Sequence, residues 1–308
     1  MLTVGLIAFS LFHFVGDPVT FMLGQDATDE QRREITRALG LDQPFYIQYL
    51  QFLRHAVQGD FGLSLRQVQP VSKLIVERLP ATLELSLVAA LFALLAGIPM
   101  GIYTALRRNS WLSHLLLAVS LAGVSLPTFL IGILLILIFS VHLGWLPSFG
   151  RGDTVALGWW TTGFLTASGL KALILPSITL GLFQMTLIQR LVRSEMLEVL
   201  RTDYIRFARA RGLSDRAIHF GHALKNTLVP VITITGLQLG AIIAFAIITE
   251  TVFQWPGMGL LFIQAVGAAD VPVMAAYLCL IALFFVIINL AVDLLYYAVD
   301  PRLRLEPT

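Results

Sequence analysis

The chain has 308 residues, of which 57% are hydrophobic and only 13% are charged, and its formal net charge is +2. An ordinary soluble domain carries roughly 25% charged residues, so this composition excludes a water-soluble globular fold. Because basic and acidic residues are interleaved, the small net charge also argues against nucleic-acid binding. The single cysteine, Cys279, excludes an intramolecular disulfide and a cysteine metal cluster.

Long apolar runs predict membrane helices, since a helix needs about 20 apolar residues to cross the hydrocarbon layer. The expected fold class is therefore an all-α integral membrane protein with about six transmembrane helices. The first run is short and has neither a basic flank nor a cleavage site, which favours a truncated first helix over a signal peptide. The expected spans are residues 1–15, 81–106, 113–142, 173–192, 228–251 and 275–298.

The chain divides into a first helix at 1–17, a polar segment at 18–80 and a core of five further helices at 81–308. If the spans alternate in direction, 12 of the 21 Lys and Arg residues lie on one side, at Arg107 and Arg108, from Arg190 through Lys225, and in the tail at Arg302 and Arg304. The positive-inside rule makes that side cytoplasmic. Both termini are then expected inside and the 18–80 segment outside, where its length favours an ordered structure.

Prolines interrupt two expected spans, at Pro99 and Pro127. Proline removes a helical hydrogen bond and clashes with the preceding turn, so a kink is expected at each. A kinked helix that lines a pathway and a static bend without function are equally good explanations, and Pro127 is the candidate pathway kink. Small residues recur at Gly236 and Gly240, which predicts close helix packing along the fifth span.

Charged residues near the spans lie close to their ends, as at Glu84, Arg190, Glu250 and Asp293. Carriers driven by ion gradients commonly hold ionisable residues at mid-membrane, so their absence there disfavours such a carrier. We therefore expect energy to enter through the largest cytoplasmic loop.

That loop, residues 193–227, favours helix on both sides of Gly212, which is suited to a left-handed helix end. Ser214 or Asp215 is expected to cap the second helix. An apolar knob among arginines could seat in a groove of another protein, whereas the alternative is a basic loop lying on anionic lipid. The expected knob residues are Tyr204, Ile205, Ala208 and Leu213.

The residues of this loop closely resemble the coupling loop of ABC importer permeases for dipeptides, oligopeptides, glutathione and nickel. The pattern is similar to the first of the two permeases, which has a long outer segment after its first helix. Arg206 and Phe207 stand where the general pattern has glutamate and alanine, while Ala208 and Gly212 keep their places. The matching segments are 204–214, 222–226, 229–230, 16–18, 40–44, 59–64, 250–253, 255–259 and 300–302.

The resemblance implies a permease subunit in the bacterial inner membrane, in contact with lipid. Its implied partners are a second homologous permease, two cytoplasmic ATPases and an extracytoplasmic solute-binding protein, with no nucleic acid. No enzyme activity and no cofactor are expected on this chain. ATP and Mg²⁺ belong to the ATPases, because the sequence has no phosphate-binding loop. Peptides are the leading solute, and glutathione and nickel chelates are alternatives.

Two other classes compete with this interpretation, a six-span membrane enzyme and a channel. The sequence offers neither a converging catalytic set nor a filter-like loop at mid-membrane. His219 and His222 are three residues apart but lack further ligands, so no metal site is expected.

The resemblance also implies roles for particular residues. At the outer face, Glu250, Trp255, Pro256 and Gly257 are candidates for a gate or a contact with the binding protein, although a structural role is an equal alternative for Glu250. The residues expected to couple to the ATPase are Asp203, Tyr204, Ile205, Arg206, Ala208, Ala210, Gly212 and Leu213.

Overall fold

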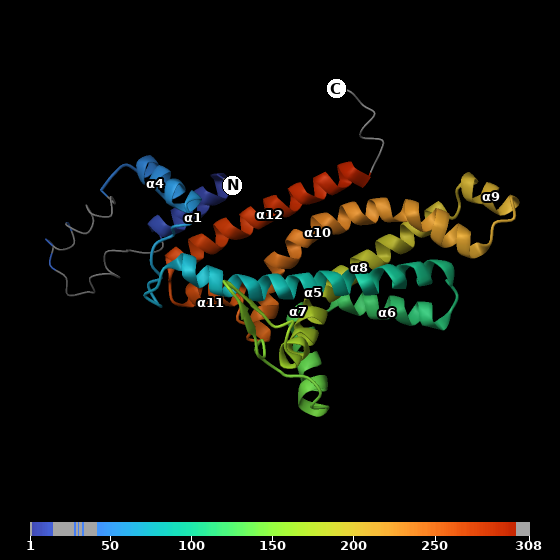
Figure 1. Cartoon of the computed structure of the whole chain (residues 1–308), viewed down its shortest axis with the longest axis horizontal. Helices are drawn as coiled ribbons and strands as arrows, with labels where there is room; N and C mark the ends of the chain where they lie inside the picture. Colours follow the sequence, from blue (N-terminus) through green and yellow to red (C-terminus); the bar gives the residue numbers. More distant parts are fainter. Residues whose placement is uncertain (1, 15–27, 29, 31–32, 34–41, 300–308) are drawn as a thin grey trace, which may run out of the picture. The chain divides into compact units, whose positions relative to one another are not determined.

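The computed structural model describes residues 2–14, 28, 30, 33 and 42–299, and these are mainly helical (Figure 1). The expected motifs at 16–18 and 300–302, the start of the one at 40–44, and the basic tail lie outside the described residues. In chain order the elements are α1 (Leu2–Phe14), α4 (Phe45–Val57), α5 (Val71–Leu106), α6 (Trp111–Ser125), α7 (Thr128–Leu135), the π-helix η1 (Ile136–His142), β1 (Val155–Leu157), β2 (Trp160–Thr162), α8 (Ala167–Val199), α9 (Asp203–Ala210), the π-helix η2 (Ala217–Ala223), α10 (Leu224–Val252), α11 (Met258–Gly267) and α12 (Val271–Val299).

The chain packs as two units, and α5 and α12 each run from one unit into the other. The first unit comprises Met1–Thr82, Ala156–Thr162 and Pro256–Phe284. The second comprises Leu83–Val155, Gly163–Trp255 and Phe285–Thr308.

Within the described residues, three helices are long and apolar enough to cross a membrane, namely Val71–Leu106, Ala167–Val199 and Val271–Leu294. The bent pair α6 and α7 with η1 makes a fourth if it counts as one span. The all-α membrane fold class is thus confirmed, whereas the number of six spans stays a prediction. Helix α5 has 36 residues and α8 has 33, so both are longer than the hydrocarbon layer requires.

The expected span at 113–142 is broken at Pro127 instead of merely kinked. The helical segments on either side of the break are bent by 116°. Leu126 adopts an extended conformation (φ −92°, ψ 139°), as the residue before a proline prefers. The Pro127 carbonyl then accepts hydrogen bonds from the amides of Leu130 and Ile131 and starts α7. Proline therefore ends one helix and begins the next.

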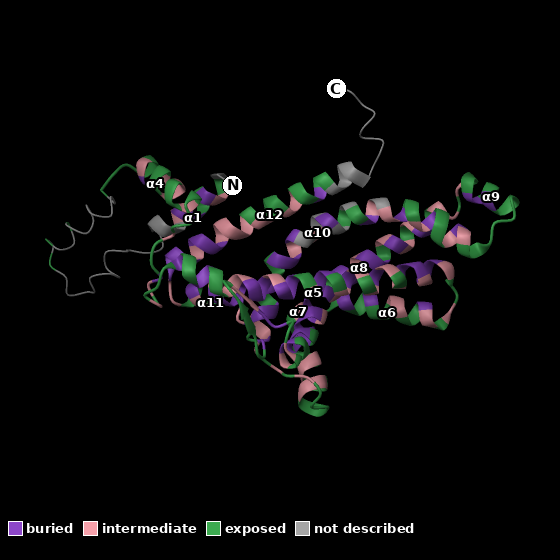
Figure 2. Cartoon of the chain, in the orientation of Figure 1, coloured by how far each residue is buried: buried purple, intermediate pink, exposed green. Residues whose placement is uncertain are grey.

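Glycines in α5 bring it close to α8 in the second unit. A Cβ atom at Gly97 would lie 2.8 Å from the Met185 carbonyl, and one at Gly101 would lie 2.6 Å from Cβ of Val192. Helix α8 carries buried residues along most of its length, from Gly169 to Met196 (Figure 2). Such close approach is typical of membrane helices, whose association depends on packing.

The small residues of α10 serve the same purpose against α12, as predicted. At Gly236 a Cβ atom would lie 2.5 Å from the Val292 side chain, and at Gly240 it would lie 2.7 Å from the Phe285 ring. Larger residues at either position would force the two helices apart.

The 59–64 motif forms an ordered turn in the first unit, pinned by the buried Asp270 before α12. The Ser64 hydroxyl donates to Asp270 Oδ2 over 2.5 Å. The backbone amides of Leu65 and Arg66 donate to the same carboxylate over 3.2 and 3.3 Å. This part of the 18–80 segment is therefore structured.

Candidate functional site

Helix α9 follows the end of α8 after one tight turn. The Thr202 amide and hydroxyl both donate to the Val199 carbonyl, over 3.1 and 2.6 Å. Asp203 then begins α9 and pairs with Arg206 one turn later at 3.1 Å. Both side chains of this pair are exposed, so it contributes at most about 1 kcal/mol. The position of α9 must therefore depend on packing.

That packing comes from Ile205 and Ala208, which are buried in a cluster with Met196 of α8 and with Ile218 and Ala223 of η2. Residues three apart lie on one face of a helix, so Ile205 and Ala208 point together into the bundle. The prediction that these two belong to an exposed knob is wrong. They attach α9 to α8 and η2 instead.

The exposed face of α9 is formed by Tyr204 and Phe207, with Leu213 following the helix. Phe207 is 64% exposed, and the guanidinium of Arg211 lies 5.7 Å from the centre of its ring. This cation–π contact is worth roughly 0.5–1 kcal/mol at an exposed site. Phe207 is a candidate that the sequence interpretation missed, although the spacing of three from Tyr204 indicates a shared face. The Tyr204 hydroxyl also accepts from Asn226 Nδ2 over 2.7 Å, which joins α9 to α10.

Gly212 ends α9 in the left-handed conformation that the sequence predicts, with φ +79°. Its amide donates to the Arg209 carbonyl over 2.9 Å, and the Leu213 amide donates to the Ala208 carbonyl over 3.3 Å. These two bonds define a Schellman motif. A Cβ atom at Gly212 would meet no neighbour within 4 Å, so only the backbone conformation demands glycine.

Of the two predicted caps, Ser214 begins the second helix. Its carbonyl accepts from the Ile218 amide over 3.0 Å, and its hydroxyl accepts from the Ala217 amide over 3.4 Å. This helix passes through η2 into α10 without interruption.

The residues predicted to couple to the ATPase thus separate into two groups. Ile205 and Ala208 are buried and hold the loop in place. The others are exposed on the loop surface: Asp203, Tyr204, Arg206, Ala210, Gly212 and Leu213.

The outer-face candidates are mostly buried. Glu250 and Trp255 have no exposed area, and the Trp255 amide donates to the Glu250 carbonyl over 2.8 Å to close the turn after α10. In the first unit, Gly257 is buried and precedes α11, and Pro256 is half-buried. Buried side chains cannot contact a partner without rearrangement, so the burial favours the structural alternative for Glu250.

A buried ion pair in the second unit escaped the sequence interpretation. Arg151 Nη2 lies 2.6 Å from Glu84 Oε2, and the two side chains are 7% and 1% exposed. The pair joins positions 67 residues apart, so no local pattern reveals it.

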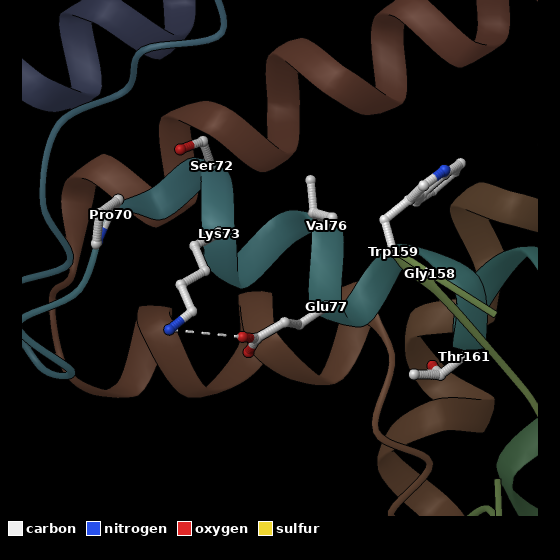
Figure 3. Close-up of a pocket in the computed structure, with 8 residues that line it drawn as sticks. All are labelled: Pro70, Ser72, Lys73, Val76, Glu77, Gly158, Trp159 and Thr161. Carbon is white, nitrogen blue, oxygen red and sulfur yellow. Dashed lines mark ion pairs between the residues drawn. The ribbon is translucent and has the colours of Figure 1, made fainter. Parts of the chain in front are cut away.

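The described part of the first unit contains an open groove of about 630 Å³ between the start of α5 and the β1–β2 turn (Figure 3). Lys73 and Glu77 face each other across one helical turn at 3.9 Å, and Trp159 stands on the hairpin side. The lining residues include no metal ligands beyond Glu77 and no nucleophile with an adjacent base. Over the described residues as a whole, no three His, Cys, Asp or Glu side chains gather to hold a metal ion.

The fold defines a helical membrane protein in which a short surface helix is attached to the end of a long buried one. Residues 97–305 match the family described as the inner membrane component of binding-protein-dependent transport systems, and residues 1–86 match the N-terminal part of that component. The chain therefore belongs to this family of transport permeases and is a permease subunit of the ABC importer type, not an enzyme.

Curated relatives match over nearly the whole chain. A di/tripeptide transport system permease protein of Pseudomonas aeruginosa is 43% identical over 98% of this chain and 94% of its own length. A dipeptide transport system permease protein of Alkalihalophilus pseudofirmus is 39% identical over 97% of this chain and 94% of its own. A glutathione transport system permease protein of Salmonella paratyphi A is 38% identical over 99% of this chain and 94% of its own length.

A solved structure shares the fold. The MetNI methionine ABC transporter in an inward-facing conformation contains a chain that is superimposable with a TM-score of 0.59 and 21% sequence identity. The match covers 74% of this chain and 96% of that chain. At this identity the similarity concerns the fold alone.

Proposed function

We propose that this chain forms half of the translocation pathway of an ATP-driven importer for peptides or similar small solutes, and that it docks on a cytoplasmic ATPase through α9. The observation that carries the docking role is the division of α9 into a buried face, Ile205 and Ala208, and an exposed aromatic face, Tyr204 and Phe207. A surface helix anchored in this way presents aromatic side chains to a partner, and such side chains dominate the energetics of protein interfaces.

The solute class rests on the relatives that are dipeptide and di/tripeptide permeases. The relative that transports glutathione, itself a small peptide, makes glutathione the second candidate. Nickel chelates are the third candidate, because the loop also resembles that of nickel importer permeases. The solute-binding protein on the outer side selects among them in this proposal.

The importer is completed by a second homologous permease, two ATPases and the solute-binding protein, within membrane lipid. ATP and Mg²⁺ bind the ATPases. When the ATPases close, α9 moves with them, and its buried contacts pass the movement to α8. A helix of 33 residues is about 50 Å long, so α8 reaches from the cytoplasmic surface to the far side of the hydrocarbon layer. Coupled rigid-body shifts then produce alternating access.

Two further assignments belong to this proposal. The break at Pro127 lines the pathway, because freed backbone groups at membrane depth require a protein- or water-lined environment. The turn containing Glu250, Trp255, Pro256 and Gly257 acts at the outer face after rearrangement. The chain lies in the bacterial inner membrane with both termini in the cytoplasm.

The 18–80 segment is expected outside, which cysteine labelling tests. Gln69 is exposed, so Gln69→Cys in a Cys279→Ser background should react with an impermeant thiol reagent in intact cells without an outer barrier. The exposed Asp215→Cys is the matched cytoplasmic control and should react only after lysis. The reverse pattern would overturn the proposed topology.

The importer function itself is tested by affinity purification of the tagged chain from its native membrane. We expect a complex with a second permease and two ATPase subunits, whose ATP hydrolysis rises when peptide-loaded binding protein is added. A chain that purifies alone under conditions that preserve such complexes would contradict the proposal.

A further inference from the structure

The buried pair of Glu84 and Arg151 lies at a junction of several elements in the second unit. One carboxylate oxygen of Glu84, on α5, accepts both from Arg151 Nη2 and, over 3.3 Å, from the Gly163 amide. Arg151 and Gly163 flank the β1–β2 hairpin. A single carboxylate therefore holds two separate segments of the second unit, at Arg151 and at Gly163, against α5.

The residues beside Arg151 bind two further helices. The Gly150 amide donates to the carbonyl of Phe253, the residue that follows the end of α10, over 2.9 Å. Asp153 exchanges two hydrogen bonds with Ser168 at the start of α8, accepting from its hydroxyl over 2.6 Å and donating its amide over 3.1 Å. Residues 150–153 thus connect α5, at Glu84, with the start of α8 and the end of α10.

The fit at this junction leaves little freedom. Gly152 has φ +68°, and a Cβ atom there would lie 2.7 Å from the Ser168 carbonyl group. A Cβ atom at Gly169 would lie 2.4 Å from the Gly163 carbonyl oxygen. The loop therefore cannot shift relative to the start of α8 without breaking these contacts.

A buried ion pair is not needed to stabilise such a junction. Removing two charges from water is costly, and a well-packed apolar pair of similar volume is often as stable or more stable. What a charged pair adds is a specific geometry, because either partner alone is strongly unfavourable when buried. In a chain with so few charges, this pair is better explained by a requirement for one arrangement of the three helices.

We propose that Glu84 and Arg151 are positioning residues for solute-stimulated transport: they hold α5 at Glu84, the start of α8 and the end of α10 in the arrangement through which arrival of solute affects the ATPases. This proposal rests on the proposed function, in which α9 couples the chain to the ATPases. The pair lies near the start of α8, and α9 follows the end of α8. Helix α8 then joins the outer junction to the coupling helix. A merely structural pair would affect assembly and leave the response to solute intact.

The test uses the reconstituted importer with three variants: Glu84→Leu/Arg151→Met, which removes both charges together; the exchange Glu84→Arg/Arg151→Glu; and Arg151→Lys, which keeps the charge. Basal ATP hydrolysis and its stimulation by dipeptide-loaded binding protein are measured, along with the amount of copurified ATPase. We expect the apolar variant to assemble with unchanged basal hydrolysis but to lose stimulation by about fivefold or more, in the range of typical coupling energies. Arg151→Lys should keep more than half of the stimulation, whereas the exchanged pair should keep less, because an arginine at position 84 cannot accept from the Gly163 amide.

Three results would overturn the proposal. The apolar variant could keep full stimulation, could fail to assemble, or could remain unrescued by both charged variants. Each of these results would show that the pair has only a structural role or no role. The unmodified importer tests the proposed function separately. If dipeptide-loaded binding protein does not stimulate ATP hydrolysis by the unmodified importer, the proposed function is wrong and this proposal fails with it.

Discussion

Phe207→Ala is expected to abolish detectable coupling between the permease and its ATPases while the chain stays folded in the membrane. Phe207 is 64% exposed, so little of its ring is buried within the chain, and the guanidinium of Arg211 lies 5.7 Å from the ring centre. Removing an aromatic anchor from the centre of an interface costs about 2 kcal/mol or more, which corresponds to roughly 30-fold weaker binding. We expect the copurified ATPase to fall accordingly and uptake to fall to background.

The matched control is Tyr46→Ala on α4, because Tyr46 is also 64% exposed but lies outside the coupling loop. It should retain the ATPases. Ile205→Ala tests the buried face of α9 instead of the exposed one. It removes a fully buried side chain and should destabilise the loop by about 2–5 kcal/mol. If Phe207→Ala retains ATPase binding at the unmodified level, α9 does not dock through its aromatic face.

Gly212→Val is expected to uncouple solute transport from ATP hydrolysis. A residue other than glycine at φ +79° costs roughly 1–2 kcal/mol, and β-branching increases the strain. The strain opposes the Schellman motif, so Leu213 and the end of α9 would take other positions. The membrane helices form their own backbone hydrogen bonds, so insertion should be unaffected. The measurement compares uptake with solute-stimulated hydrolysis in liposomes.

Gly221→Val provides a matched control for this substitution. Gly221 lies in the neighbouring η2, a Cβ atom there also meets nothing within 4 Å, and its φ is not positive. It therefore receives the same side chain in equally open space without the left-handed strain. Equal uncoupling by both substitutions would show that the conformation of Gly212 is not the cause.

Local chemistry made part of this structure predictable from the sequence. Gly212 was identifiable because a left-handed helix end strongly favours glycine, and Ser214 because its hydroxyl suits a helix start. Pro127 marked a disturbance of its span, but the size of the bend depends on packing that one sequence does not report. Helix α5 begins at Val71, ahead of the predicted span, since apolar residues mark the membrane and not the end of a helix.

The remaining features depend on contacts between distant residues. Ile205 and Phe207 are both apolar, and only the cluster with Met196 and Ile218 decides that Ile205 is buried while Phe207 is exposed. The pair of Glu84 and Arg151 likewise gives no local pattern, because Glu84 by itself resembles a charge near the end of a span and Arg151 resembles a charge in a loop. Tertiary packing therefore determined which candidates are anchors and which are surface.

The most direct test of the importer function is uptake of a radiolabelled dipeptide by proteoliposomes that contain the purified complex, with the binding protein outside and nucleotide supplied to the ATPases. The account predicts accumulation against a concentration gradient with ATP and none with ADP, and loss of accumulation in the Phe207→Ala complex. Uptake of the same size with ADP, or accumulation that follows an imposed proton gradient in the absence of ATP, would contradict it.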